Sequence, residues 1–327
     1  MPSRRLLLSL LPLAAALATP RVCHAQAPWP SKPVKIAVPA PAGSSLDIIA
    51  RLLGERLAER WGQPVVVENK PGAGGMLGTD VAAKAAPDGH TMALSFNGPI
   101  AFAPFLYGKV PYNVAKDLVP VVMTTSQPNV LAVNAAKVPA KTVKEFVDWA
   151  RAGNGAMNYS SLGNGSSAHL TMELFLAEAG VKGTHIPFNG SPPAAMAVAQ
   201  GEVDATFMVA PALLPHVTSG KVRLIAVSSA QPVESMKELP TLASAGYRAV
   251  ESMAWNGLFV PAATPATVVA KINADVNAVL ADNAVRTALD HQGLTPVGGS
   301  AVDFQRVVDA EQKRWAPIIT KIGIKLD

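Results

Sequence analysis

Short apolar segments alternate with amphipathic ones along most of this chain, and this alternation limits its fold more than any other feature. In the first hundred residues, apolar runs predict strands at 34–38, 65–68 and 91–95. Residues 48–57 repeat Ile and Leu at helical spacing, and 76–85 form a second helical pattern. Asp47 is expected to cap the first helix. Strands and helices in this order predict an α/β protein with a parallel, doubly wound sheet.

A second set of alternating elements follows Pro128. It contains expected strands at 130–133 and 157–160 and expected helices at 143–151 and 167–179. The tail is helical, with patterns over 265–280, 284–292 and 302–319. Two similar α/β halves followed by a helical tail predict two lobes, with the tail folded back onto the first.

The N-terminus has the features of a signal peptide. Arg4 and Arg5 precede an apolar run at 6–18, and small residues suitable for cleavage follow at 23–27. The apolar run is far shorter than the roughly 20 residues that a membrane-spanning helix needs. We therefore expect residues 1–25 to be removed as the protein is exported to the periplasm.

Removal of this segment changes what the composition indicates. Cys23 is the only cysteine, so the mature protein would contain no disulfide, no thiol nucleophile and no cysteine metal ligand. Three of the 28 basic residues lie in the segment, and the 25 that remain nearly balance the 23 acidic residues. No cluster of Lys and Arg with interleaved aromatic residues occurs, so no nucleic-acid partner is expected.

The common catalytic and cofactor patterns are missing from the sequence. The glycine-rich segment 72–78 follows a strand and opens a helix, but its spacing misses the dinucleotide fingerprint by one residue. There is no phosphate-binding P-loop and no G-x-S-x-G motif. The histidines beyond the signal peptide form no metal-binding pair; they are His90, His169, His185, His216 and His291. The sequence predicts no catalytic residue, no metal and no cofactor.

Loops that join expected strand ends to expected helix starts are rich in small and polar residues; they span 39–47, 97–99 and 160–167. In open α/β sheets, ligands bind outside the carboxyl ends of the strands. A helix start there offers free N–H groups and the positive end of the helix dipole, which suit an anion. Each loop alone is equally well explained as an ordinary turn, but two such loops in separate lobes favour a ligand cleft.

Neither these loops nor the segment 188–193 contains a basic residue. A carboxylate buried in the cleft must still be compensated, because an unpaired buried charge is costly. We therefore expect backbone N–H groups, hydroxyls and side-chain amides to hold it without a direct Arg or Lys ion pair.

At these residues the sequence resembles the Bug family of extracytoplasmic solute receptors, which serve tripartite tricarboxylate transporters. The longest matching stretch is GQPVVVENKPGAGG at 62–75, which continues in APDGHT at 86–91. Shorter motifs follow in the family's order: GEVD at 201–204, LPT at 239–241 and GLFVPA at 257–262. The resemblance covers nearly the whole mature chain.

The resemblance implies a two-lobed fold like a type II periplasmic binding protein (a Venus flytrap) with a ligand cleft between the lobes. Residues 28–127 and 255–327 would form lobe 1, and residues 128–254 lobe 2. Family ligands are small carboxylates held by the first strand–helix loop and by a loop that opens a second-lobe helix. With the loop amides, the candidate ligand-binding residues are Ala42, Gly43, Ser44, Ser45, Leu46, Asp47, Asn97, Asn164, Gly165, Ser166, Ser167, Asp204 and Phe207.

Some positions depart from the family pattern. Ser44 stands where a second glycine is usual, Leu46 where a small polar residue is common, and Phe188 replaces a frequent tyrosine. Ser44 and Leu46 belong to the expected ligand loop, so the identity of the ligand cannot be carried over. Asp204 is equally well explained as a cap at a strand end.

The leading interpretation is a monomeric periplasmic receptor that captures a small carboxylate and delivers it to the subunits of a tripartite tricarboxylate-type membrane transporter. The alternative is a secreted enzyme on a two-lobed scaffold, which the lack of a nucleophile–base pair disfavours. A sensor subunit that presents its ligand to a membrane kinase is a third reading, which the sequence does not separate from transport.

Overall fold

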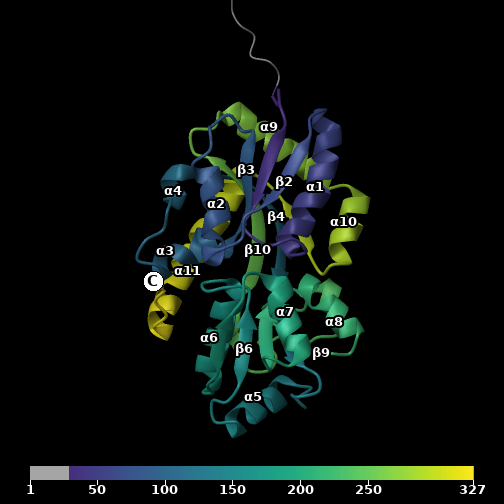
Figure 1. The fold of residues 1–327 in the computed structure, drawn as a ribbon, viewed down its shortest axis with the longest axis vertical. Helices are drawn as coiled ribbons and strands as arrows, with labels where there is room; N and C mark the ends of the chain where they lie inside the picture. Colours follow the sequence, from purple (N-terminus) through teal and green to yellow (C-terminus); the bar gives the residue numbers. More distant parts are fainter. Residues whose placement is uncertain (1–28, 327) are drawn as a thin grey trace, which may run out of the picture.

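The computed structural model describes residues 29–326 as two lobes, each built on its own β-sheet (Figure 1). The signal peptide expected over residues 1–25 lies outside the described residues. Over residues 29–326, no helix combines the length and apolar character that a membrane span requires.

Lobe 1 is built on a six-stranded sheet with the order β11-β4-β10-β3-β1-β2. Its strands are β1 (Val34–Val38), β2 (Val65–Asn69), β3 (Thr91–Phe96), β4 (Leu118–Pro128), β10 (Met253–Pro261) and β11 (Thr295–Gly298). β1 pairs in parallel with β2 and β3, whereas β10 is antiparallel to both β3 and β4, so that β4 runs in the same direction as β1 to β3. The sheet is therefore mixed and not parallel as expected, because β10 enters it from the direction of lobe 2.

Helices cover both faces of this sheet. They are α1 (Ser45–Trp61), α2 (Met76–Ala83), the short α3 (Ala103–Leu106) and α4 (Val114–Asp117), α9 (Ala266–Leu280), α10 (Asn283–Asp290) and α11 (Ala301–Ile322). Ile49, Leu53 and Leu57 of α1 are fully buried in one hydrophobic cluster with the strands. On α11, the ring of Phe304 lies so close to β10 that a Cβ at Gly257 would be 2.2 Å from it. The helical tail thus packs on lobe 1, as expected.

Lobe 2 has a five-stranded sheet with the order β7-β6-β8-β5-β9. Its strands are β5 (Val130–Asn134), β6 (Asn158–Ser161), β7 (Thr184–Pro187), β8 (Ala205–Met208) and β9 (Val222–Val227). The helices are α5 (Val143–Ala152), α6 (Ser167–Ala179), α7 (Ser191–Gln200) and α8 (Leu214–Thr218). Here β6, β7 and β8 are parallel, and β5 runs antiparallel to β8 and β9.

The chain passes between the lobes at two adjacent places. It leaves lobe 1 from β4 through Asn129 into β5, and it returns through Ser252 into β10. The Asn129 N–H donates to the Ser228 hydroxyl (2.9 Å), and the Ser228 N–H donates to the Asn129 carbonyl (2.9 Å). The Ser252 N–H donates to the Ser228 carbonyl at 2.9 Å. These bonds tie the two passages into one narrow connection, while the lobes on either side have separate sheets.

Candidate functional site

A cavity of about 50 Å³ lies between the lobes at the carboxyl ends of their parallel strands. Residues that follow β1, β3 and β6 line it, including Pro39, Asn97 and Leu162. The rims of the two lobes touch around it: the Tyr107 hydroxyl of lobe 1 donates to the Asn164 carbonyl of lobe 2 at 3.2 Å. The two lobes therefore touch at their rims and leave little free space between them.

The first wall of the cavity is the start of α1. Ser44 is its N-cap and accepts from the Asp47 N–H (3.3 Å), while the Asp47 carboxylate accepts from the Gly43 N–H (3.0 Å). Ser44, Ser45 and Leu46 line the cavity as expected from the sequence, but Asp47 does not. Ser44, and not Asp47, caps the helix: Asp47 occupies the third helical position, and its carboxylate reaches back to the N–H of Gly43, the residue before the N-cap, in a variant of the capping box.

Asp47 instead fixes the conformation of this loop. Its carboxylate also accepts from Asn69 Nδ2 at 3.0 Å and pairs with Arg51 Nη2 at 3.0 Å. Burial alone would raise the pKa of Asp47, but the hydrogen bonds from Arg51, the Gly43 amide and Asn69 outweigh burial and hold the pKa below its usual value. Asp47 is therefore ionised and fully occupied by loop contacts.

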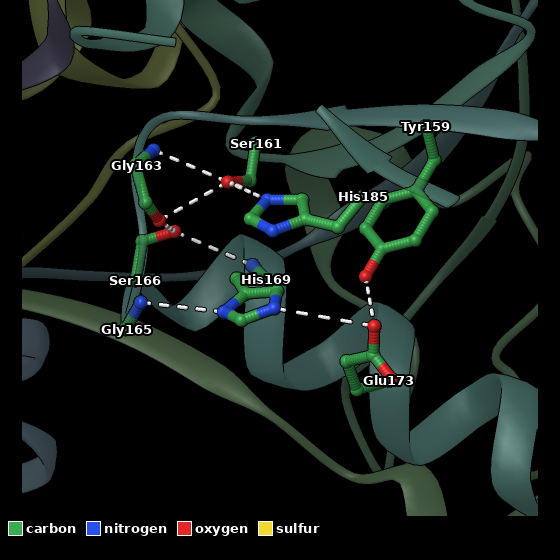
Figure 2. Close-up of polar contacts among 8 residues, drawn as sticks. All are labelled: Tyr159, Ser161, Gly163, Gly165, Ser166, His169, Glu173 and His185. Carbon is green, nitrogen blue, oxygen red and sulfur yellow. Dashed lines mark hydrogen bonds and ion pairs between the residues drawn. The ribbon is translucent and has the colours of Figure 1, made fainter. Parts of the chain in front are cut away.

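The second wall is the start of α6, shown in Figure 2. Ser166 is the N-cap: its hydroxyl accepts from the His169 N–H (3.3 Å) and donates to the Gly163 carbonyl (2.7 Å). The Gly165 N–H donates to His169 Nδ1 at 3.3 Å, and the Gly163 N–H donates to the Ser161 hydroxyl at 3.1 Å. The loop thus bends back onto its own helix, and its last residue, Ser167, lines the cavity.

Two stacked histidines support this loop from beneath. The rings of His169 and His185 lie 3.8 Å apart and nearly parallel, and His185 Nε2 is 2.7 Å from the Ser161 hydroxyl (Figure 2). Burial, with His185 nearby, lowers the pKa of His169 to about 3, and burial lowers that of His185 to about 4. Glu173, 4.0 Å from His169 Nε2, accepts a hydrogen bond from the Tyr159 hydroxyl. Both histidines are therefore neutral near pH 7, and His169 accepts the Gly165 bond through an unprotonated Nδ1.

Two further helix starts complete the walls. Gly74 and Gly75 line the cavity just before α2, and Gly190 and Ser191 do so at the start of α7. The first N–H groups of a helix have no acceptor within the helix, and they carry partial positive charge. The free N–H donors come mainly from α1 and α6, because Pro192 and Pro193 occupy the first turn of α7 and the Met76 N–H at the start of α2 donates to the Ala73 carbonyl. The positive dipole ends of all four helices still favour an anion in the cavity.

The floor of the cavity, formed by Asn97, Gln127 and Asn256, is made of side-chain amides. Gln127 is 1% exposed, and neither atom of its amide has a partner among the described residues. Asn97 Nδ2 donates to the Met253 carbonyl at 3.0 Å, while its Oδ1 has no partner there. Gln127 is not among the ligand-binding residues expected from the sequence; the missed signal is the polar run TTSQ at 124–127, which follows the apolar residues 118–123.

The remaining candidate residues lie away from the cavity surface. Ala42 and Gly43 shape the α1 loop, and Asn164, Gly165 and Ser166 shape the α6 loop, without lining the cavity; Phe188, by contrast, does line it. Asp204 lies at the opposite end of the sheet, where its carboxylate accepts from the Asn158 N–H (2.9 Å) at the start of β6. Phe207 is fully buried in the core of lobe 2 against Phe175. Because parallel β6 and β8 begin at the same edge, a residue before β8 lies far from their carboxyl ends.

The residues that line the cavity include no acidic and no basic side chain. Within residues 29–326, no group of three or more His, Cys, Asp or Glu side chains is placed to hold a metal ion. The site offers N–H donors, hydroxyls and amides together with apolar contacts from Leu46, Phe96 and Phe188. Such an arrangement is suited to binding a small, partly apolar anion.

Comparison with known proteins gives the same picture. Residues 49–324 match the family model described as the tripartite tricarboxylate transporter family receptor. Protein BugT of Bordetella pertussis is 36% identical over 299 residues, which cover 91% of each chain. The solved structure of R. palustris Rpa4515 with adipate has a TM-score of 0.88 and 33% identity, covering 91% of this chain and 99% of that one. MatC from Rhodopseudomonas palustris with bound malate has a TM-score of 0.83 and 32% identity, covering 89% and 100%.

The buried histidines lead to a prediction about acid stability. Their folded pKa values lie below the unfolded value near 6.5, so their neutral forms stabilise the fold above about pH 6.5, and this contribution is lost as the pH falls toward 4 and then 3. For His169 alone the loss at pH 5 is about 2 kcal/mol. Urea denaturation at pH 7.5 and pH 5 measures it. His169→Gln should show a smaller drop than wild type, and the exposed-site control His291→Gln should keep the full drop. An equal drop in His169→Gln would contradict this assignment.

Proposed function

This chain belongs to the tripartite tricarboxylate transporter receptor family, and from this premise we propose that it binds a small carboxylate between its lobes and delivers it to a membrane transporter. The observation that carries the proposal is the convergence of four helix starts on a cavity without charged side chains. The adipate of Rpa4515 and the malate of MatC are both carboxylates, which supports the same class of ligand here.

The carboxylate is held without an ion pair to Arg or Lys. The amides of Ser45, Leu46 and Ser167 lie in the first turns of α1 and α6 and have no intrahelical acceptor, so they are free to donate. A hydrogen bond to a charged group contributes about 1.5–3 kcal/mol. A helix start adds roughly 0.3–1 kcal/mol, and up to about 2 kcal/mol when partly buried. A few such donors are enough to replace a cation.

The lobes act as a hinged trap. We take residues 28–127 and 255–327 as lobe 1 and residues 128–254 as lobe 2, with rotation occurring at the passages through Asn129 and Ser252. Loops of both lobes line the cavity, so each lobe supplies part of the binding site. A ligand that contacts both walls therefore stabilises the closed form over the open one.

The receptor works in the periplasm, where members of this family function. We assign residues 1–25 as its signal peptide, and the transporter's membrane subunits as the partners of a monomeric receptor. The family and its solved relatives are binding proteins, so the ligand should be released chemically unchanged.

The export step predicts a specific mature N-terminus. Mass spectrometry of protein exported by its host should find a chain that starts near Gln26 or Pro28. Recovery of chains that retain Met1 in the soluble cytoplasm, with none exported, would contradict the assignment.

A carboxylate placed at the first helix start should abolish binding. Asp caps helices as well as Ser does, so Ser44→Asp keeps the cap of α1 but sets a negative charge against the ligand. Like charges in contact cost several kcal/mol, and we expect affinity to fall at least roughly 100-fold. Calorimetric titration with adipate or malate, whichever binds more tightly, measures the change.

A matched control is the same substitution at the exposed N-cap of α11, Ser300→Asp, which should leave affinity unchanged. Arg51→Ala, which removes the cation paired with Asp47 of this loop, should alter affinity only modestly. Loss of binding in any single Arg→Ala or Lys→Ala variant that stays folded would refute an ion-pair-free site.

Hinge closure predicts a change in overall size. Small-angle scattering should give a smaller radius of gyration with saturating ligand than without it, because rotation at Asn129 and Ser252 brings the lobes together. An unchanged radius at full occupancy would indicate a rigid site and argue against the trap.

A further inference from the structure

Three buried polar atoms at the floor of the cavity have no protein partner among the described residues: both amide atoms of Gln127 and Asn97 Oδ1. Both side chains are at most 1% exposed, and both line the cavity. Buried polar atoms in proteins are rarely left without a hydrogen bond. These atoms are therefore placed to bond with a molecule that enters the cavity.

No side chain of residues 29–326 forms a hydrogen bond with these three atoms, although the buried Glu311 carboxyl is close enough to the Asn97 amide for that amide to influence the pKa of Glu311. Asn256, the third member of the floor, donates its Nδ2 to the Thr125 hydroxyl at 2.9 Å. Asn97 Nδ2 donates to the Met253 carbonyl, which fixes the direction of the amide and leaves Oδ1 as an acceptor. In the pairing of β4 with β10, Gln127 lies opposite Ala254, which has no polar side chain. The partners of these atoms must therefore come from within the cavity, as a ligand group or a bridging water.

The requirement is chemically specific. Gln127 Nε2 is a donor, and a carboxylate oxygen satisfies it. Gln127 Oε1 and Asn97 Oδ1 are acceptors, and an ionised carboxylate has no proton to give them. An ammonium group would supply protons, but no acidic side chain lines the cavity to compensate its charge. A neutral donor is the remaining choice, and a ligand hydroxyl group can supply it in place of a bridging water.

We propose that Gln127 and Asn97 determine specificity for a carboxylate that carries a hydroxyl group on its carbon chain. The proposal rests on the proposed function and goes beyond it. The helix starts bind the carboxylate, and the amide side chains of the floor form hydrogen bonds with the hydroxyl. An analogue without the hydroxyl leaves the amide oxygens unpaired, and a site built to bond a hydroxyl discriminates strongly for that reason.

The test compares matched ligand pairs that differ by one hydroxyl. The purified mature protein is titrated calorimetrically with succinate and malate, glutarate and 2-hydroxyglutarate, adipate and 2-hydroxyadipate, and phenylacetate and mandelate. In the pair that binds most tightly, we expect the hydroxylated member to bind at least about tenfold more tightly than its parent. Gln127→Leu, which keeps the volume but removes the amide, should reduce this ratio to within about twofold.

The half-buried amide Gln305, which donates to Asp309 on α11 and lies outside the cavity lining, provides the control: Gln305→Leu should keep the wild-type ratio. Parent acids that bind as tightly as their hydroxylated partners would overturn the inference and leave carboxylate binding intact. A panel in which no carboxylate binds the folded protein would overturn the proposed function itself. If Gln127→Leu fails to fold, the wild-type ratio alone decides.

Discussion

The antiparallel pairing of β4 with β10 is the constraint on which the rest of the structure depends. It runs from Leu118 opposite Pro261 to Pro128 opposite Met253, and both strands leave lobe 1 at this second end. Within residues 29–326 the chain crosses between the lobes only beside this pair, so the pairing sets the position of the connection between them. It also sets Gln127 beside Ala254 and brings the Met253 carbonyl within reach of Asn97. The connection between the lobes and the polar floor of the cavity are thus two parts of one strand pair.

Much of the local structure could be predicted from the sequence because it depends on neighbours in the chain. The helix at 167–179 begins and ends where its pattern indicates, since Ser166 caps it and Gly180 ends it in the left-handed conformation. The α1 loop was recognised as a strand-to-helix turn, but its cap was assigned to Asp47. Ser and Asp are equally good caps, so only the geometry of the capping box distinguishes Ser44 from Asp47.

Features that depend on contacts between distant parts of the chain could not be predicted from the sequence pattern. The direction of β10 and the position of Gln127 follow from a register between residues more than a hundred positions apart. Asp204 belongs to a recognisable motif, yet the parallel pairing of β6 and β8 places it at the far edge of the sheet. An α/β pattern gives the order of elements but not the edge at which a given residue lies. The loops that follow parallel strands are the exception, because the carboxyl ends of parallel strands all lie at the same edge of the sheet.

The end of the described chain lies at the junction of the lobes. Leu326 donates its N–H to the Leu106 carbonyl at 2.8 Å, and Lys321 pairs with Glu178 of lobe 2 at 3.2 Å. Figure 1 marks this terminus beside α3 and α11, whereas Trp29 packs on Trp61 at the other end of lobe 1. An environment-sensitive dye attached near residue 326 would therefore change its surroundings when the lobes separate. Immobilised through its N-terminal side and labelled at this end, the receptor has the geometry of an optical biosensor.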